Sequence, residues 1–298
     1  MGKSLLVFGA GGQLGRELLR AAPPAGYRVQ GATRGDADIT RDDQVAAAID
    51  RTRPALVINA AAYTAVDKAE SEPEAAFAVN RDGAAVLAAA CRAADLPLIQ
   101  VSTDYVFDGT KQRAYREDDP VAPLGVYGAS KEAGERAVRE GLDRHIILRT
   151  AWVFGAFGGN FVKTMLRLAE TRDALGVVDD QTGCPSPARA IAETILTIAG
   201  TPNKAWGTYH FAGQPPITWH GFAKEIFAAR QARTGRAGPK LSAITTADYP
   251  TAARRPANSV LDGSKLTQAF GIEPADWRAG LADVLDEILP QQAERQAQ

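Results

Sequence analysis

The chain has 298 residues, of which 45% are hydrophobic and 23% charged, and its formal net charge is −1. This length suits one large domain or two unequal domains that share a core. The near-neutral charge argues against nucleic acid or an anionic membrane surface as the main partner. The cysteines, Cys91 and Cys184, are far apart, and the histidines lack metal-ligand spacing, which argues against a disulfide scaffold and a zinc site.

The composition is that of a packed, soluble enzyme. No apolar run in the sequence is long enough to cross a bilayer, and the N-terminal residues lack the apolar core of a signal peptide. We therefore expect a cytoplasmic protein that has neither a membrane nor a nucleic acid as its partner.

The first predicted element is a buried parallel strand at residues 4–8, because these residues form a continuous apolar run. Gly9, Gly12 and Gly15 follow at once, and residues 16–19 continue with helical character. A dinucleotide site needs glycines in such a strand–helix turn, both for a close approach of the backbone to a pyrophosphate and for close helix–strand packing. We therefore expect these glycines to bind a cofactor; the weaker alternative is a purely structural glycine turn.

A second strand is expected at residues 27–32, and it should end near the adenosine ribose of the cofactor. Sites that prefer NAD usually have an acidic residue here, whereas a nearby arginine suits the 2′-phosphate of NADP. The sequence has Ala32 and, two residues later, Arg34, which favours NADPH and leaves NADH possible. The alternative is that Arg34 is a solvated loop charge. Asp38 and Ile39 follow and are expected to approach the adenine.

Helical and strand-like segments then alternate up to residue 149. The expected helices cover residues 42–51, 72–93 and 127–139, and the expected strands cover residues 55–58, 98–101 and 145–149. This alternation predicts an α/β fold with a Rossmann-type, doubly wound parallel sheet. Ligands of such sheets bind at the carboxyl ends of the strands. We therefore expect Ala62, Tyr63 and Thr64 to flank the cofactor, and Thr103 to lie at the same edge of the sheet.

Tyr127 and Lys131 are the strongest candidates for catalysis, since they are four positions apart on one predicted helix and share one of its faces. A free tyrosine has a pKa of ~10, and a nearby ammonium group lowers it. Tyr127 is then a proton donor to a carbonyl oxygen during reduction, and the Thr103 hydroxyl hydrogen-bonds the same oxygen. The Tyr-x-x-x-Lys pattern alone occurs often by chance. Its combination with Thr103 and the glycine loop predicts catalysis.

Beyond residue 150 the alternation weakens, and a smaller region that covers the substrate is expected. The predicted elements are helices at residues 161–170, 188–199, 219–230, 264–269 and 277–289, and a short strand at residues 206–211. We predict an NAD(P)-binding Rossmann domain at residues 1–150 and a mainly substrate-binding region at residues 151–298, whose chain is free to cross back to the core. A proline-rich loop carries Arg254 and Arg255. Arginine forks match phosphate oxygens, so Arg255 is expected to bind a nucleotide diphosphate; the alternative is a solvated arginine pair.

The glycine pattern, Thr103 and the pair Tyr127 and Lys131 together resemble the extended short-chain dehydrogenase/reductase superfamily. Five further sequence words resemble one family inside it, the dTDP-4-dehydrorhamnose reductases. These words are NAAAYTAVDKAE at residues 59–70, STDYVFDG at 102–109, RTAWVF at 149–154, NFVKTM at 160–165 and RPANS at 255–259. The words come in the right order, and the resemblance runs nearly end to end, which makes it highly specific.

The resemblance implies the last step of dTDP-L-rhamnose synthesis, in which NAD(P)H reduces the C4 keto group of dTDP-4-dehydro-6-deoxy-L-mannose. It implies that Tyr127 protonates the oxygen and that Lys131 binds the nicotinamide ribose and keeps Tyr127 acidic. Thr103 and Asp104 are expected at the reacting hydroxyls, with Thr103 also tuning the pKa of Tyr127. Trp152 is expected to contact the sugar nucleotide. The structural alternatives are a turn role for Asp104 and core filling for Trp152.

The same resemblance implies that the cofactor phosphates and the adenine side of the cofactor channel are contacted by Gly12, Gln13, Leu14, Ala62, Tyr63 and Thr64. The sequence departs from the family at two points. The acidic ribose ligand of some relatives is Ala32 here. Some relatives form a metal-bridged dimer; Glu17 matches one ligand position, but Arg189 stands about where another carboxylate is expected. We therefore predict no required metal, with Glu17 as a helix-surface charge, in a monomer or homodimer.

Two other functions stay open at this point. One is another sugar-nucleotide reductase or an epimerase of the same superfamily, and the other is a catalytically silent relative that regulates a partner enzyme. Net epimerisation consumes no NADPH, so cofactor stoichiometry separates the first alternative. The intact catalytic residues speak against the second. Asp67, Lys68 and Glu70 are interpreted as a structural charge cluster.

Overall fold

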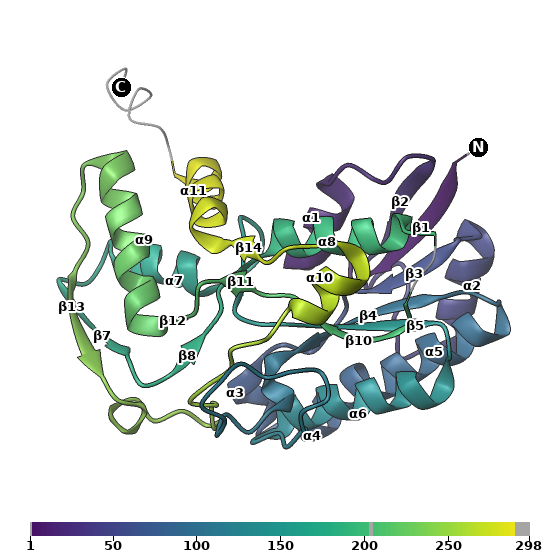
Figure 1. The fold of residues 1–298 in the computed structure, drawn as a ribbon, viewed down its shortest axis with the longest axis horizontal. Coiled ribbons are helices and arrows are strands. Elements are labelled where there is room, and N and C mark those ends of the chain that lie inside the picture. Colours follow the sequence, from purple (N-terminus) through teal and green to yellow (C-terminus); the bar gives the residue numbers. More distant parts are fainter. Residues whose placement is uncertain (1, 203–204, 290–298) are drawn as a thin grey trace.

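A computed structural model describes residues 2–202 and 205–289, and its centre is a parallel six-stranded sheet in the order β10-β5-β4-β3-β1-β2 (Figure 1). The strands are β1 (Lys3–Phe8), β2 (Tyr27–Ala32), β3 (Leu56–Asn59), β4 (Leu98–Thr103), β5 (His145–Thr150) and β10 (Gly207–His210). These are the strands that the sequence predicts, so the Rossmann-type parallel sheet is confirmed. The strand order changes direction between β1 and β3, and ligands bind at such a switch point.

Helices cover both faces of the sheet, which explains the continuous apolar runs in its central strands β1 and β3. One layer contains α1 (Gln13–Arg20), α8 (Ala188–Gly200) and α10 (Ser264–Phe270), and the other contains α2 (Asp42–Thr52), α5 (Gly83–Ala93) and α6 (Val126–Gly141). In β1, Leu5 and Val7 pack into the core of the first layer. Leu6 and Phe8 pack into the core of the second. Alternate side chains of a strand point to opposite faces, so a strand buried on both sides must be apolar at every position.

The long alanine-rich helix is present, but a π-helical turn interrupts it. α4 (Pro73–Phe77), the π turn (Ala78–Asp82) and α5 follow one another directly. From the π turn, the buried Asn80 amide donates to Ser130 Oγ (2.9 Å) and to the carbonyl of Tyr63 (3.1 Å). The turn therefore ties the loop after β3 to helix α6.

The second half of the chain forms a smaller lobe beside the sheet (Figure 1). Its elements are α7 (Phe161–Leu168), α9 (Trp219–Thr234), α11 (Trp277–Ile288) and a parallel strand pair, β7 (Ala174–Val178) and β13 (Lys240–Ile244). The helices match the predicted ones and share an apolar core that includes Phe222 and Trp277. The sequence does not predict the strand pair, because both strands are largely exposed and lack a clear apolar alternation.

The chain returns from the small lobe to the sheet, where α8 packs on α1 and β10 extends the sheet beside β5. Short strand pairs join neighbouring segments: β6 (Val153–Phe154) with β9 (Ser186–Pro187), β8 (Thr182–Gly183) with β12 (Ile217–Thr218), and β11 (Gly213–Gln214) with β14 (Ala275–Asp276). In the part of the chain that the structure describes, no helix is both long and apolar enough to span a membrane.

Gly134 allows α6 to approach the π turn closely, and this contact predicts an effect on stability. A Cβ atom at Gly134 would clash with the backbone carbonyl oxygen of Asn80. We expect Gly134→Ala to lower the free energy of unfolding by about 2 kcal/mol, a typical cost of overpacking. Urea denaturation followed by circular dichroism measures this change. Gly159→Ala is the control, since no atom lies within 4 Å of its Cβ position. A Gly134→Ala variant as stable as the wild-type protein would contradict this reading of the contact.

Candidate active site

A cavity of about 760 Å³ opens along the carboxyl ends of β1, β3, β4 and β5. The predicted residues that line it are Gly9, Gly12, Gln13, Leu14, Arg34, Asp38, Ile39, Ala62, Tyr63, Thr64, Thr103, Asp104, Tyr127, Lys131 and Trp152. Of the predicted site residues, Gly15 and Arg255 lie outside this lining. Residues from distant parts of the sequence therefore meet at the sheet edge where the fold places a ligand.

The glycine loop brings backbone against backbone at one end of the cavity. Gly9 has φ +83°, and a Cβ there would lie 2.5 Å from the backbone nitrogen of Ala61. Gly15 packs the first turns of α1 onto the loop, because a Cβ there would clash with the Gly9 carbonyl oxygen and lie 2.7 Å from Ala10 Cα. Gly15 thus shapes the loop from behind, whereas Gly12 and Gln13 line the cavity. The floor left by these glycines is open to a dinucleotide.

Arg34 and Asp38 lie at the β2 side of the cavity, where their side chains are paired at 3.2 Å. The Asp38 carboxylate also accepts hydrogen bonds from the backbone N–H and the hydroxyl of Thr40 (3.0 and 2.8 Å). The Thr40 N–H is the main reason why the Asp38 pKa lies below its usual range. Asp38 therefore fixes its own loop. The Arg34 side chain is 84% exposed, and an exposed ion pair of this kind is weak, so its guanidinium is open to an anion.

The loop that carries Tyr63 is held by Asn80 of the π turn. The Tyr63 backbone N–H donates to Asn80 Oδ1 (2.9 Å), and the Tyr63 hydroxyl donates to Glu72 (2.9 Å). The Asn80 side-chain amide also donates a hydrogen bond to the Tyr63 carbonyl. Together these contacts fix Ala62, Tyr63 and Thr64 against the cavity.

Tyr127 and Lys131 lie in the first turns of α6, next to the end of β4. Lys131 Nζ donates to the Val101 carbonyl (2.7 Å), and burial lowers the pKa of its ammonium group to about 8, against the opposing effect of Glu135. Burial raises the Tyr127 pKa to about 12; the Thr103 hydroxyl acts to lower it and the Asp104 charge to raise it. The expected lowering of the Tyr127 pKa by Lys131 is therefore wrong for this geometry, because burial dominates. Tyr127 is held as a neutral phenol, the form that donates a proton.

Asp104 is a buried carboxyl with one oxygen free. Its Oδ1 accepts from the Thr103 hydroxyl (2.9 Å), whereas Oδ2 has no hydrogen-bond partner among the described residues. Burial raises the Asp104 pKa to about 6, and the nearby Ser259 hydroxyl opposes this rise. Asp104 also begins the short 3-10 helix η2 (Asp104–Val106), which agrees with the turn interpretation, and its contact with substrate stays a prediction. A buried oxygen without a partner is costly, and a ligand hydroxyl in the cavity would satisfy it.

Trp152 forms the wall of the cavity on the side of the small lobe. Its backbone has φ +46°, and its ring stacks on that of Trp219 at a centroid distance of 3.4 Å and an angle of 5°. Gly183 makes room for the indole, since a Cβ there would clash with it. Both tryptophans line the cavity, so Trp152 is a wall residue in contact with another lobe rather than simple core filling.

Arg255 is held away from the cavity by an ion pair. Its guanidinium donates to both carboxylate oxygens of Asp67 (3.1 and 2.7 Å), and the Ala253 N–H donates to Asp67 as well. Phosphate binding by Arg255 stays a prediction. The predicted charge cluster of Asp67, Lys68 and Glu70 has structural roles, but its members contact other residues rather than one another. Lys68 pairs with Glu72 at 2.8 Å. Glu70 accepts a hydrogen bond from the N–H of Val126, the first residue of α6. This last contact takes the place of a helix cap.

The cavity also contains residues that the sequence did not single out, among them Ser102, Tyr105, Thr150, Gly158 and Trp219. Thr150 ends β5 directly beside Thr103 in the register, a position that a strand-end rule would have found. Trp219 starts α9, and nothing local marks it as a site residue. Gly158 belongs to a loop that is fixed by the Gln13 side chain, which is hydrogen-bonded to Val153 and Asn160.

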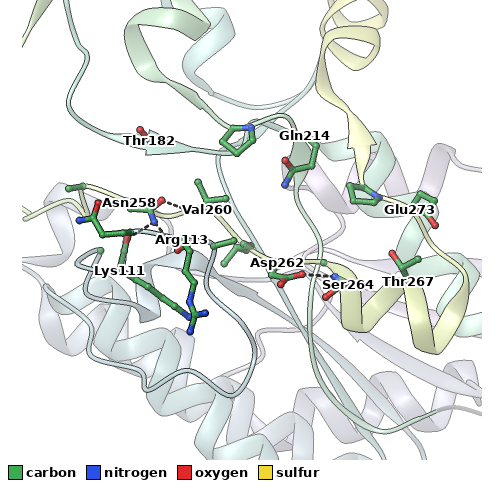
Figure 2. A pocket seen from close by; sticks show the side chains of 18 of the residues that line it. Lys111, Arg113, Thr182, Gln214, Asn258, Val260, Asp262, Ser264, Thr267 and Glu273 are labelled. Carbon is green, nitrogen blue, oxygen red and sulfur yellow. Dashed lines mark hydrogen bonds between the residues drawn. The ribbon is translucent and has the colours of Figure 1, made fainter.

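Figure 2 shows a larger cavity, of about 960 Å³, whose lining includes none of the predicted site residues. Its polar groups hold neighbouring loops together. Asn258 Nδ2 donates to the carbonyls of Lys111 (2.7 Å) and Arg113 (3.1 Å), and Asp262 accepts from the backbone N–H of Ser264 (2.9 Å). We interpret this cavity as a junction between loops.

Glu17 lies in a third, smaller cavity, of about 330 Å³, together with Arg189. The prediction of a surface charge is wrong, since Glu17 is 2% exposed. It pairs with Arg20 at 3.0 Å, and Arg20 also binds Glu287 at 2.7 Å. Burial raises the Glu17 pKa, and Arg20 opposes this rise. Among residues 2–202 and 205–289, no group of three or more His, Cys, Asp or Glu side chains has a metal-binding arrangement. That no metal is required stays a prediction.

The fold and the site together define a class. The protein has a Rossmann-type sheet, a glycine loop, a threonine at a strand end and a Tyr–Lys pair on a helix. This combination is typical of an extended short-chain dehydrogenase/reductase. A sequence model of the RmlD substrate binding domain matches residues 3–289. The dTDP-4-dehydrorhamnose reductase of Aggregatibacter actinomycetemcomitans is 48% identical over 287 residues, which cover 94% of this chain and 97% of that protein. That of Escherichia coli (strain K12) is 41% identical, with 96% and 98% covered. The chain belongs to the dTDP-4-dehydrorhamnose reductase family.

A solved structure agrees with this assignment. The dTDP-4-dehydrorhamnose reductase of Bacillus anthracis in complex with NADP has a TM-score of 0.90 to this chain at 34% identity, with 96% of this chain and 100% of that chain covered. The orthologue from Clostridium acetobutylicum has the same TM-score at 36% identity, with 96% and 100% covered. The resemblance found in the sequence is therefore confirmed at the level of family and fold.

The position of Tyr127 predicts the effect of removing its hydroxyl. We expect Tyr127→Phe to lower kcat by roughly 10²-fold or more, the usual contribution of a general acid, because the Tyr127 phenol lies beside the Thr103 hydroxyl in the cavity. NADPH affinity should stay within about twofold, since the ring remains. Steady-state kinetics and a fluorescence titration of NADPH measure the two quantities. Tyr249→Phe is the control, because Tyr249 is exposed. Near-normal turnover of Tyr127→Phe would remove the tyrosine from its catalytic role.

The environment of Asp104 predicts a pH effect. An ionised carboxylate accepts a substrate hydroxyl more strongly than a neutral carboxyl group. Because the Asp104 pKa is raised to about 6, kcat/KM for the sugar substrate should fall as the pH is lowered through that value. Asp104→Asn should have a lower kcat/KM above pH 6 and should lack this acidic limb. A variant that retains the acidic limb would assign it to another group.

Proposed function

We propose that the protein reduces the C4 keto group of dTDP-4-dehydro-6-deoxy-L-mannose with NADPH and releases dTDP-L-rhamnose, the final step of dTDP-rhamnose synthesis. The observation that carries this proposal is the convergence of Thr103, Asp104, Tyr127 and Lys131 at one end of the cavity, with the glycine loop at the other. The first group suits a carbonyl and its neighbouring hydroxyls, and the second suits a dinucleotide. Family membership adds the substrate class.

The residues present fit a dinucleotide. Gly9 lets the loop pack against the backbone of Ala60 and Ala61, Gly12 lines the cavity without a side chain, and Arg34 offers an exposed cation near the end of β2. When bound, NADPH supplies the hydride. Gly12, Gln13 and Leu14 hold the phosphates, and Ala62, Tyr63 and Thr64 form the wall of the adenine side.

The chain's own residues handle the proton and the orientation of the sugar. Tyr127 donates its phenolic proton to the C4 oxygen. Thr103 donates to the same oxygen when its hydroxyl turns away from Asp104 Oδ1. Lys131 holds the ribose and stabilises the phenolate that remains after proton transfer. Asp104 accepts a sugar hydroxyl through its free oxygen, and Trp152 offers a flat apolar face to the sugar nucleotide. Burial excludes water from this end, which strengthens each polar contact.

The organisation of the molecule around this reaction is part of the proposal. We assign residues 1–150 mainly to NAD(P) and residues 151–298 mainly to the substrate, with α8 and β10 as the part that crosses back to the core. The end of this second region, residues 290–298, lies outside the described residues. We also propose a cytoplasmic location, where both NADPH and nucleotide sugars are made, and a monomer or homodimer that works without a metal.

The experiment that tests the function is a coupled assay. dTDP-4-dehydro-6-deoxy-L-mannose is generated in situ by a 3,5-epimerase, and the oxidation of NADPH is followed by absorbance. One NADPH consumed per rhamnose nucleotide formed would support the proposal. Conversion of the sugar without net consumption of NADPH would show an epimerase instead. Bound NADPH without any conversion would favour another keto sugar or a regulatory protein.

Arg34 predicts the choice between the two cofactors. We expect Arg34→Ala to raise KM for NADPH by roughly tenfold, the value of a charge-assisted hydrogen bond, and to leave KM for NADH within about twofold. Arg41→Ala is the matched control: Arg41 is exposed, pairs with Asp43 and lies outside the cavity lining. If Arg34→Ala changed KM for NADPH and for NADH equally, Arg34 would be a solvated loop charge without a role in the choice of cofactor.

A further inference from the structure

Behind the catalytic wall, a buried ion pair connects helix α6 to strand β5. Arg149 donates to both carboxylate oxygens of Glu135, from Nε (2.9 Å) and from Nη2 (2.7 Å). The two side chains are 3% and 0% exposed. Burial alone would raise the Glu135 pKa, but the hydrogen bonds and charge of Arg149 outweigh it, and the net direction is downward. Glu135 is therefore held as a carboxylate within the protein core.

The same carboxylate reaches the end of β4. The Ser102 hydroxyl donates to Glu135 Oε1 at 2.5 Å. Ser102 stands between Val101, whose carbonyl accepts from Lys131, and Thr103. In the register of the sheet, Ser102 lies opposite Arg149, and Thr103 lies opposite Thr150. One side chain thus joins three elements that each deliver residues to the cavity.

The position of Glu135 on its own helix completes the link. It lies one turn after Lys131 and two turns after Tyr127, on the part of α6 that faces the sheet. We propose that Glu135 is a positioning residue of the reaction. Through Ser102 and Arg149 it fixes the position of α6 relative to β4, and so the position of Tyr127 and Lys131 relative to Thr103. This inference rests on the proposed function, which defines the reaction that Tyr127 and Lys131 catalyse.

The charge of Glu135 gives the proposal a second consequence. Burial lowers the Lys131 pKa, and Glu135 is the group that opposes this. The other charged or titratable groups around the carboxylate are Arg139 on α6 (3.0 Å), Arg149 on β5 and, beyond Arg149, His210 on β10. Burial and the Arg149 charge lower the His210 pKa to about 3, so this histidine is neutral. On its cavity side Lys131 is accompanied by Tyr127 and Asp104. Glu135 is thus the anion that helps to keep Lys131 protonated.

The test compares Glu135→Gln with Glu132→Gln. Glu132 lies on the same helix and pairs with Arg139 at 3.5 Å, so the control removes the same charge nearby without touching β4 or β5. NADPH affinity is measured by fluorescence over a pH series, and kcat and KM are measured with the sugar substrate. We expect Glu135→Gln to lower kcat at least tenfold, because small misplacements of catalytic groups are costly, with a smaller change in KM for the sugar.

The pH series distinguishes positioning from a merely structural role. In the wild-type protein, NADPH affinity should weaken as the pH rises through about 8, where Lys131 loses its proton. Loss of the Glu135 charge lowers that pKa further, so the weakening should begin at lower pH in Glu135→Gln and should be unchanged in Glu132→Gln. A folded Glu135→Gln variant with wild-type kcat and wild-type pH dependence would overturn the proposal, as would an equal shift in both variants.

Ser102→Ala keeps the proposal testable if Glu135→Gln fails to fold, because this variant leaves the pair of Glu135 with Arg149 intact. We expect a folded protein with a lower melting temperature, because the buried Glu135 carboxylate loses one hydrogen bond, and a kcat that falls about fivefold. Wild-type kcat in Ser102→Ala would overturn the link to β4. The NADPH titration needs no sugar substrate. If the wild-type protein does not reduce the keto sugar, the proposed function fails, and the titration still decides whether Glu135 controls Lys131.

Discussion

The contact between helix α6 and the end of strand β4 is the constraint on which the rest of the site depends. The helix carries Tyr127 and Lys131, and the strand carries Thr103, so the reaction needs their relative position to be fixed. Glycine makes the approach possible: a Cβ at Gly128 would clash with the carbonyl oxygen of Tyr105. Lys131 Nζ then reaches the Val101 carbonyl at 2.7 Å. The Gly128 approach is set by backbone atoms, so side-chain motion cannot relax it, and the lysine contact ties a side chain of α6 to the backbone of β4.

Burial is the second constraint, and it decides how the catalytic groups ionise. Taking a group out of water penalises its charged form. The same cause therefore acts in opposite directions, raising the pKa of Tyr127 to about 12 and of Asp104 to about 6 while lowering that of Lys131 to about 8. The result is a phenol that keeps its proton until a carbonyl needs it, beside a lysine whose charge depends on its neighbours.

Much of the fold and part of the site could be predicted from the sequence, because the signals are local. Each of these signals lies within a short stretch of sequence. They are the apolar run of β1 with the glycines after it, the strand-end position of Thr103, and the spacing of Tyr127 and Lys131. The rest depends on tertiary contacts. Trp219 and Trp152 stack although they are far apart in the sequence, and Arg255 pairs with Asp67 across most of the chain. The lowering of the Tyr127 pKa was expected from spacing, which carries no information about burial.

We expect this cavity to deliver a hydride to C4 of the sugar while Tyr127 supplies the proton. The measurement that tests this step uses NADPH with deuterium at both hydrogen positions of the nicotinamide C4, together with dTDP-4-dehydro-6-deoxy-L-mannose. Mass spectrometry and proton NMR then locate the label in the isolated product. One deuterium, bound to C4 of the rhamnose ring, is expected. A product without deuterium, or with deuterium at another carbon, would contradict it.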